Sequence, residues 1–546
     1  MKVISKTKKQ RIYHLVLLII FIIYCSFLWF PKSNFLYRDD DIPLILIEAK
    51  RTEQKPSITR PFKNSELFDY FAYSYGAFHS FIKISEIKFF KGTGVIHTEQ
   101  NHRYFIIIIN LMIMVGIIFV LSRIIRFDWA IYSIFWLVSL PTEASGIKLG
   151  VVLNFFFLIS IIASGLLWLK TKNQKYLALM YLSLGLDIIN NSLFFTDIFI
   201  VLSIVFFYSL NATGFKLKVF KEFIINTYQT LKSFWILIPI IAYSGILFFT
   251  KHYADFLQSA YYKYTGMIIH NAIKSENSPN FGFYGHDVIA NVPCQVGIPL
   301  FAISILTLIV FIFRKKIKPL HWILLAVFIA FLLPMLFYYD IVWLGTPNKY
   351  MLFIIPGIVL TGIMYAQLVD RLRFKIIYLI IPLILTIPYV FGAVWNIKPF
   401  NNLYKNAPNL SLYGQWRENN GTKSIAWFIR ENNILTSQVY SQESGGTELF
   451  YFGGYTKKIT SKTHFSDQIT KGQNVYLLEL LNDKDEIVNI RKNLIKKYQL
   501  FEGVKVIDGD QIIARIWTND SKYQSFTLNL KETDQKYNQK YLVYEK

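Results

Sequence analysis

The chain has 546 residues, of which 53% are hydrophobic, 17% aromatic and 17% charged. Soluble domains carry about 25% charged residues, so this chain is markedly poor in them. Its mean hydropathy is +0.35, and long uncharged runs recur, among them 104–121, 151–169, 234–250 and 376–395. Each run is close to the roughly 17–25 residues that a helix needs to cross a bilayer. This composition excludes a soluble single domain, a disordered chain and a disulfide-rich secreted module, and it predicts a multi-span membrane protein.

The formal net charge of +23 comes from 58 basic and 35 acidic residues. Residues 401–546 hold 20 basic and 16 acidic residues, so most of the excess positive charge lies in the membrane part. We attribute this charge to membrane topology and expect no nucleic-acid partner. The two cysteines, Cys25 and Cys294, stand in or beside apolar runs, which excludes a disulfide framework and a zinc cluster.

The N-terminus is basic and leads into an apolar run of 19 residues, 12–30. This order is typical of a signal peptide, but the large residues Trp29 and Phe30 stand where a cleavage site needs small ones. We therefore expect an uncleaved first span.

We place spans by apolar length and orient them by lysine and arginine, which favour the cytoplasmic side of short loops. The eleven expected spans are 12–30, 104–122, 127–141, 149–169, 176–191, 194–210, 234–250, 293–313, 320–338, 350–368 and 376–395. Every second connecting segment is basic, through Arg123 and Arg126; Lys170, Lys172 and Lys175; Lys216, Lys218, Lys221 and Lys232; Arg314, Lys315, Lys316 and Lys318; Arg371, Arg373 and Lys375. The N-terminus is expected in the cytoplasm and the tail outside it, in a bacterial cytoplasmic (inner) membrane.

The predicted fold class is an all-α multi-span membrane domain over 1–395, with an outer loop at 31–103, and a small extracytoplasmic α/β domain over 396–546. In the tail, 424–432 has the apolar spacing of a helix. The predicted strands are 437–443, 475–481, 504–508 and 511–517. We expect the polar last 25 residues to be loosely ordered.

Four charged residues, Arg38, Asp39, Asp40 and Asp41, closely follow the first span. Three adjacent carboxylates repel one another and are ready to take a proton or bind a cation. The amphipathic stretch IPLILIEAK comes next and is suited to the membrane interface, where a base acting on a lipid-linked substrate must stand. A solvated loop that ends the span is the simpler interpretation, and a Mg²⁺ or Mn²⁺ site at Asp39–Asp41 is a third.

Two further candidates lie on the same predicted face. Glu143 is the carboxylate of a short outer loop, and Lys349 stands at the start of a late span. Cationic side chains at the membrane surface suit a phosphate group, which makes Arg38 and Lys349 candidate phosphate ligands. The simpler interpretations are a solvated Glu143 and a Lys349 that snorkels to the interface. His286 and Asp287 lack a third ligand at metal spacing, which argues against a metal there.

Several motifs are absent from the sequence. It has no GxxxxGK[ST] loop of a P-loop ATPase, no HExxH and no GxSxG. Charged residues are nearly absent from the predicted spans, whereas ion-coupled transporters need them at mid-membrane.

With these residues in view, the chain resembles the GT-C glycosyltransferases that use lipid-linked sugars, in the branch of the protein O-mannosyltransferases and aminoarabinose transferases. Members carry an Asp-Glu pair after the first span, followed by a small and a basic residue. Here Ala49 and Lys50 stand eight and nine residues after Asp41, and this spacing identifies Asp41 as the Asp of the family's pair. The adjacent acids instead select Asp40 with Asp41, and Ile42 stands where the first spacing needs the family's Glu.

The resemblance extends over most of the chain. The stretches 121–150, 349–363 and 424–454 are similar to the family's second and third spans, its late Lys-Tyr span and its outer domain. The tail has no WWD motif, which argues against an oligosaccharyltransferase.

The resemblance implies inverting transfer of a sugar from a polyprenyl-phosphate donor to a lipid, glycan or protein acceptor of the cell envelope. One carboxylate would deprotonate or orient the acceptor hydroxyl, and cations would stabilise the leaving phosphate. No cofactor is required, apart from the alternative of a metal at the acidic cluster. The candidate residues are Asp40, Asp41, Asp39 and Glu143 for catalysis, and Arg38 and Lys349 for the donor phosphate.

Three other classes of protein stay open. A polysaccharide polymerase or ligase would concentrate arginine and histidine in a large late outer loop, but 251–292 has no arginine. A transporter of lipid-linked glycans would show repeats and buried charges, and the sequence has neither. A non-enzymatic assembly protein would survive alanine at Asp40 and Asp41, whereas an enzyme would not.

Overall fold

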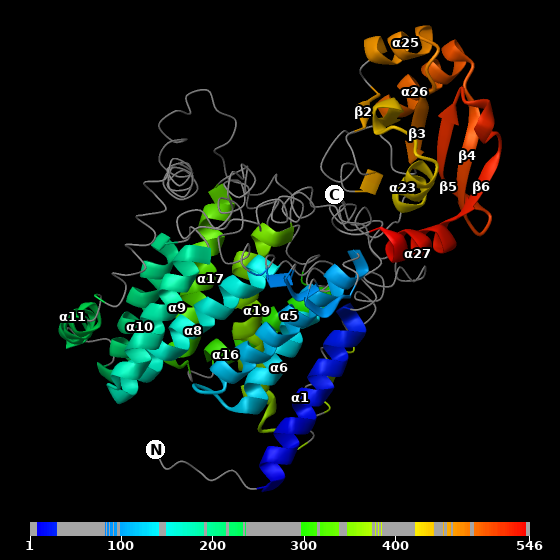
Figure 1. Ribbon diagram of the computed structural model, residues 1–546. Coiled ribbons are helices and arrows are strands. Elements are labelled where there is room, and N and C mark those ends of the chain that lie inside the picture. Colours follow the sequence, from blue (N-terminus) through cyan, green and yellow to red (C-terminus); the bar gives the residue numbers. More distant parts are fainter. Residues whose placement is uncertain are drawn as a thin grey trace, which may run out of the picture. The chain divides into compact units, whose positions relative to one another are not determined.

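The computed structural model of the protein describes residues 8–29, 99–140, 149–190, 194–213, 218–232, 298–313, 317–337, 347–373, 421–441, 456–459, 462–480 and 485–541, with some single residues between 82 and 95 and at a few other positions. The chain divides into two compact units (Figure 1). The first comprises Met1–Lys32, Pro56–Ile82 and Ile106–Tyr413 and contains the helical body. The second comprises Ser33–Lys55, Lys83–Phe105 and Gly414–Lys546 and contains an α/β domain.

The apolar runs of the sequence form helices. Along the chain these are α1 (Lys8–Trp29), α5 (Glu99–Leu121), α6 (Phe127–Val138), α8 (Leu149–Thr171), α9 (Gln174–Asn190), α10 (Phe194–Thr213), α11 (Lys218–Leu231), α16 (Ile298–Phe313), α17 (Pro319–Phe337) and α19 (Pro347–Val369). All except α11 coincide with predicted spans, which confirms helices at those places.

The number of spans is not confirmed. By length and composition, three helical stretches of the described part of the chain are able to cross a membrane: Gln10–Phe27, Asn101–Leu121 and Val152–Thr171. The other apolar helices are shorter over their described residues. The spans predicted at 234–250 and 376–395 lie outside the described residues, apart from a few single positions in the second.

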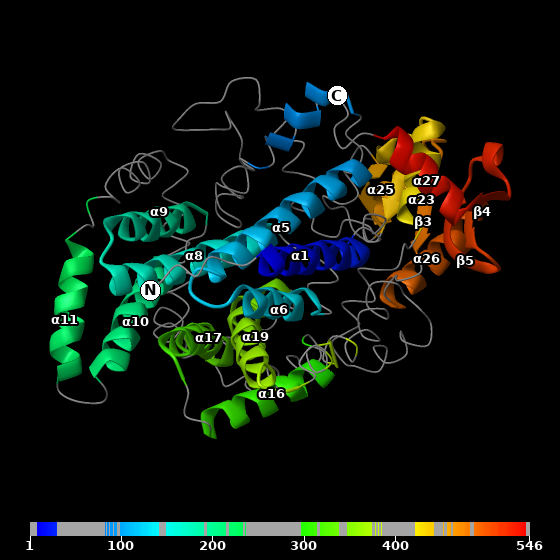
Figure 2. The same ribbon diagram turned by 90° about the horizontal axis from the view of Figure 1, so that it is seen from below.

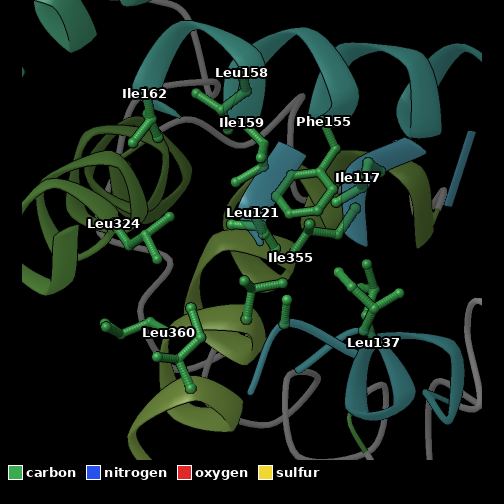
Figure 3. Packing of buried hydrophobic residues seen from close by; sticks show 14 of the residues in the cluster. Ile117, Leu121, Leu137, Phe155, Leu158, Ile159, Ile162, Leu324, Ile355 and Leu360 are labelled. Atoms are coloured by element: carbon green, nitrogen blue, oxygen red, sulfur yellow. The ribbon is translucent and has the colours of Figure 1, made fainter. Parts of the chain in front are cut away.

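One apolar core joins α5, α6, α8, α17 and α19 (Figure 3). Its members include Ile117 and Leu121 of α5, Phe155 of α8 and Ile355 of α19. All four side chains are buried. Lipid tails are as apolar as these side chains, so inside a bilayer the core stabilises the body through close packing rather than through release of water.

Glycine allows α19 to approach α6 closely. A Cβ added at Gly362 would lie 3.0 Å from the Cα of Ser133 and 3.5 Å from the Cγ of Trp136. One turn along the pair, the rings of Trp136 and Tyr365 lie 5.0 Å apart. The two helices therefore meet backbone to backbone, as small residues permit in membrane proteins.

Helix α11 was not predicted, and it lies at the edge of the body beside α10 (Figures 1 and 2). Asn226 holds it from its buried side: its Oδ1 accepts from Lys172 Nζ at 2.9 Å, and its Nδ2 donates to Ser209 Oγ at 3.1 Å. The exposed side carries a stripe of large apolar residues, Phe220, Ile224, Tyr228 and Leu231. Such a stripe, next to several lysines, fits a helix that lies along a membrane surface.

The α/β domain contains a mixed six-stranded sheet in the order β2-β1-β3-β5-β4-β6. Its elements are α23 (Thr422–Glu431), β1 (Val439–Ser441), β2 (Lys457–Lys458), α25 (Lys462–Thr470), β3 (Tyr476–Leu480), α26 (Asp485–Tyr498), β4 (Phe501–Asp508), β5 (Gln511–Thr518), β6 (Phe526–Asn529) and α27 (Leu530–Lys540). Strand β5 pairs antiparallel with β3 and β4, and the other pairs are parallel.

The two faces of the sheet are covered by different helices. On one face, Tyr440 and Leu477 pack with Phe465 of α25 and Leu494 of α26. On the other face, α23 and α27 pack together and against β5 and β4. Successive residues of a strand point to opposite faces of the sheet. Because helices cover both faces, consecutive apolar residues are buried in β3 and β5.

The predicted helix at 424–432 is confirmed as α23, and the four predicted strands are confirmed, in chain order, as β1, β3, β4 and β5. The expectation of a loosely ordered last stretch is wrong for 526–540, which forms β6 and α27. Helix α27 is polar overall, but it buries Leu530, Thr533 and Tyr537, which recur at helical spacing on one side. The predicted division of the chain at 395/396 falls outside the described residues and stays a prediction.

Candidate functional site

Most residues of the predicted site lie outside the part of the chain that the structure describes. These are Arg38, Asp39, Asp40, Asp41 and Glu143, and also His286 and Asp287. Their roles stay predictions. Among the described residues, no group of three or more His, Cys, Asp or Glu side chains is placed to hold a metal ion.

Lys349 is the third residue of α19 (Pro347–Val369). It precedes the last residue, Val369, by 20 positions. At about 1.5 Å per residue the two lie about 30 Å apart, which is close to the thickness of a bilayer's hydrocarbon core. Lys349 thus lies at the opposite end of α19 from Val369, and its predicted place at the outer membrane surface stays a prediction.

The structure brings together one acid–base pair that the sequence did not indicate. Glu86, in the first predicted outer segment, bonds through Oε1 to Nδ1 of His102 in the first turn of α5. Both side chains are almost fully buried, at 0% and 1% exposure. This buried contact ties the segment to the start of α5. The two residues are 16 positions apart, and no motif marks them.

A second polar cluster lies at one end of the helical body, around Arg126. Arg126, just before α6, donates from Nε and Nη2 to the two carboxylate oxygens of Asp128, at 3.1 and 2.5 Å. Its Nη1 donates to Oδ2 of Asp370, just after α19, at 2.7 Å. Burial lowers the pKa of the Arg126 guanidinium, but the two carboxylates raise it by more, so the net shift is upward.

The same cluster joins three of the predicted basic segments. Arg126 lies over the ring of Trp129, with its Cζ 4.9 Å from the ring centre. Lys318, before α17, lies with Nζ 5.9 Å from the same ring centre. Segments that the charge pattern assigns to one side of the membrane are thus together at one end of the body. This supports the relative placement of the three segments.

The chain has a multi-helix body of apolar helices and a C-terminal α/β domain, and it is an integral membrane protein. No family model matches the sequence. No curated protein matches it either.

Among solved structures, the chain is similar to the crystal structure of ArnT from Cupriavidus metallidurans bound to undecaprenyl phosphate. The identity is 11%, the TM-score 0.50, and the match covers 93% of this chain and 98% of that one. The oligosaccharyltransferase of Archaeoglobus fulgidus in the apo form also matches, at 11% identity and a TM-score of 0.48, over 87% of this chain and 70% of that one. The similarity to ArnT confirms the resemblance at the level of the fold.

Proposed function

We propose that the protein is a membrane glycosyltransferase that moves a sugar from a polyprenyl-phosphate donor to an acceptor outside the cytoplasm. One observation carries the proposal: the fold similarity to ArnT covers almost the whole of both chains, helical body and α/β domain alike. The ArnT structure holds undecaprenyl phosphate, a polyprenyl phosphate that lacks only the sugar of such a donor. The acidic cluster after the first span supplies the second, independent support.

In the proposed reaction a carboxylate at Asp40 or Asp41 takes the proton of the acceptor hydroxyl, or orients it. The hydroxyl oxygen attacks the anomeric carbon and forms the new glycosidic bond. The bond from that carbon to the phosphate oxygen breaks, and the lipid phosphate leaves with the electron pair. Attack from the face opposite the leaving group inverts the anomeric configuration.

Cations stabilise the charge that develops on the leaving phosphate. Arg38 and Lys349 are the proposed ligands, since Arg38 adjoins the acidic cluster and Lys349 lies at the outer end of α19 in the predicted topology. Asp39 and Glu143 are further acidic candidates around the same site. The proposed reaction needs no cofactor, but three adjacent aspartates are also suited to Mg²⁺ or Mn²⁺.

The experiment is donor consumption by the purified full-length protein in detergent. It is incubated with a panel of polyprenyl-phosphate sugars and membrane acceptors, with and without EDTA. The variants are Asp40→Ala, Asp41→Ala and the double variant, and the matched control is Asp69→Ala, a carboxylate of the same outer segment away from the cluster.

Wild type and Asp69→Ala are expected to consume one donor. The double variant is expected to lose at least about a hundredfold in rate, as removal of a general base typically does. The single variants then identify the base. Full activity in the double variant would place the base elsewhere, and no donor consumption by wild type across the panel would overturn the glycosyltransferase proposal. Loss of activity in EDTA would add the metal.

A further inference from the structure

The cluster around Arg126 borders a cavity of about 270 Å³ at the end of the body opposite Lys349. Four helices supply its lining, which consists of Arg126, Trp129, Phe311, Lys318, Gln367, Leu368, Asp370 and Arg371. Two of these helices, α6 and α17, begin at the cavity, whereas α16 and α19 end there. Their dipoles oppose one another, so the charges of the side chains decide what the cavity attracts.

The charge at the cavity is positive. Arg126 is neutralised by Asp128 and Asp370, through bonds of 2.5–3.1 Å. Lys318 and Arg371 also line the cavity, and neither forms an ion pair with any residue that the structure describes. These three cations and two carboxylates give a net charge of +1, and among the described residues both carboxylates pair with Arg126 rather than with Lys318 or Arg371.

Two hydrogen-bond donors at the cavity wall have no acceptor among the residues that the structure describes. Nε2 of Gln367 and Nε1 of Trp129 are both buried, and neither bonds to any of the described residues. An unpaired buried donor costs about 1–3 kcal/mol, so native proteins keep such groups where a ligand or water satisfies them. Both side chains belong to the lining, and both groups need an oxygen acceptor.

We propose that this cavity binds the phosphate group of an anionic ligand, with Lys318 and Arg371 as its charged ligands and Gln367 and Trp129 as donors. A phosphate offers several acceptor oxygens and one or two negative charges, which matches cationic side chains together with neutral N–H donors. The predicted topology places the cavity at the cytoplasmic surface, where two sources exist: the headgroup of an anionic phospholipid and free phosphate. This site is separate from the proposed sugar-transfer site and does not depend on it.

The test uses full-length protein in detergent, titrated with phosphatidylglycerol, with diacylglycerol of the same acyl chains, and with inorganic phosphate. Bound lipid is counted by native mass spectrometry, and bound phosphate by isothermal calorimetry. The variants are Lys318→Ala, Arg371→Ala and Gln367→Leu. The matched control is Arg123→Ala, an exposed arginine of the α5–α6 connection that does not line the cavity. The thermal midpoint without ligand shows that each variant folds.

Wild type and Arg123→Ala are expected to bind phosphatidylglycerol and not diacylglycerol. Lys318→Ala and Arg371→Ala should each weaken binding about tenfold, since each removes a charged partner of the phosphate. Gln367→Leu, which keeps the volume but removes the donor, should weaken it several-fold. Binding of inorganic phosphate with the same pattern of losses would also support the site and make the free anion its ligand. Three outcomes would overturn the proposal. These are binding by all variants that equals binding by wild type, diacylglycerol binding as tight as phosphatidylglycerol binding, and no binding of either phosphatidylglycerol or inorganic phosphate.

Discussion

Arg126 Nη1 and Asp370 Oδ2 lie 2.7 Å apart although 244 residues separate them in the sequence. The bond joins the connection before α6 to the connection after α19. The same two helices are also in close contact at Gly362 and Ser133. A polar link at one end of α6 and α19 thus fixes the same pair of helices that pack backbone to backbone inside the body.

The first prediction concerns this link. Arg126 is 48% exposed and Asp370 23%, so solvent screens their attraction. A double-mutant cycle with Arg126→Ala and Asp370→Ala should give a coupling free energy of about 0.2–1 kcal/mol in favour of the pair. It is measured by unfolding the full chain in mixed micelles. A coupling of zero would mean that Arg126 acts through Asp128 alone.

The second prediction concerns the contact of α6 with α19. Gly362→Ala places a methyl group 3.0 Å from the Cα of Ser133, and a backbone atom cannot move aside. We expect a loss of about 1–3 kcal/mol from overpacking, more than the gain of up to about 1 kcal/mol in helix propensity. Gly116→Ala is the matched control, because its Cβ would meet only the ring of Phe156, at 3.1 Å, and a ring can turn.

The control variant should keep its thermal midpoint within a degree or two of wild type, while Gly362→Ala lowers it clearly. If both variants unfold at the wild-type temperature, the contact of the two helices is looser than the structure gives.

The third prediction concerns Glu86 and His102. Glu86→Ala removes the carboxylate that bonds to the buried His102, so we expect the full chain to lose about 3 kcal/mol of stability. Glu86→Gln retains an oxygen that can accept from the ring, and it should lose less. Lys88→Ala, an exposed residue of the same segment, should unfold like wild type. A Glu86→Ala midpoint equal to that of Lys88→Ala would contradict a stabilising role for the pair.

The sequence predicts those parts of the fold that depend on local properties. Helix α8 was expected at 149–169 and runs over Leu149–Thr171, because an apolar run of that length has few alternatives in a membrane. The charge pattern also predicts that Arg126 and Lys318 lie near each other, because it assigns their two basic connecting segments to the same side of the membrane.

The remaining features depend on contacts between distant residues. Neither Glu86 with His102 nor the donors of Gln367 and Trp129 at the cavity can be read from spacing, because tertiary packing alone brings them to one place. Helix α27 escaped prediction because most of its residues are polar, and the sheet supplies the apolar partner for its few buried ones. The acidic cluster Asp39–Asp41 remains a prediction from the sequence, with the transferase assay as its test.

The fourth prediction is a pH dependence within the α/β domain. Glu431, at the end of α23, accepts hydrogen bonds from Lys540 Nζ at 2.5 and 2.8 Å and from the hydroxyl of Tyr541. The bonds from Lys540 and then from Tyr541 lower the pKa of Glu431, while its slight burial opposes them. Because the folded pKa lies below the unfolded value of about 4.3, the contribution to stability is complete above that value. It is lost as the pH falls through the lower folded value.

Hydrogen exchange of the full chain, corrected for the intrinsic effect of pH, measures this contribution in α27. Protection of 530–540 should fall on going from neutral pH to below about 4 in the wild type. In Glu431→Gln the protection should already be lower at neutral pH, since the neutral amide cannot pair with Lys540, and the further fall with acid should shrink. Glu532→Gln is the matched control, because the ion pair that Glu532 forms among the described residues is with Lys536 of the same helix. If Glu431→Gln shows the full acid-dependent loss, another carboxylate governs the docking of α27 on α23.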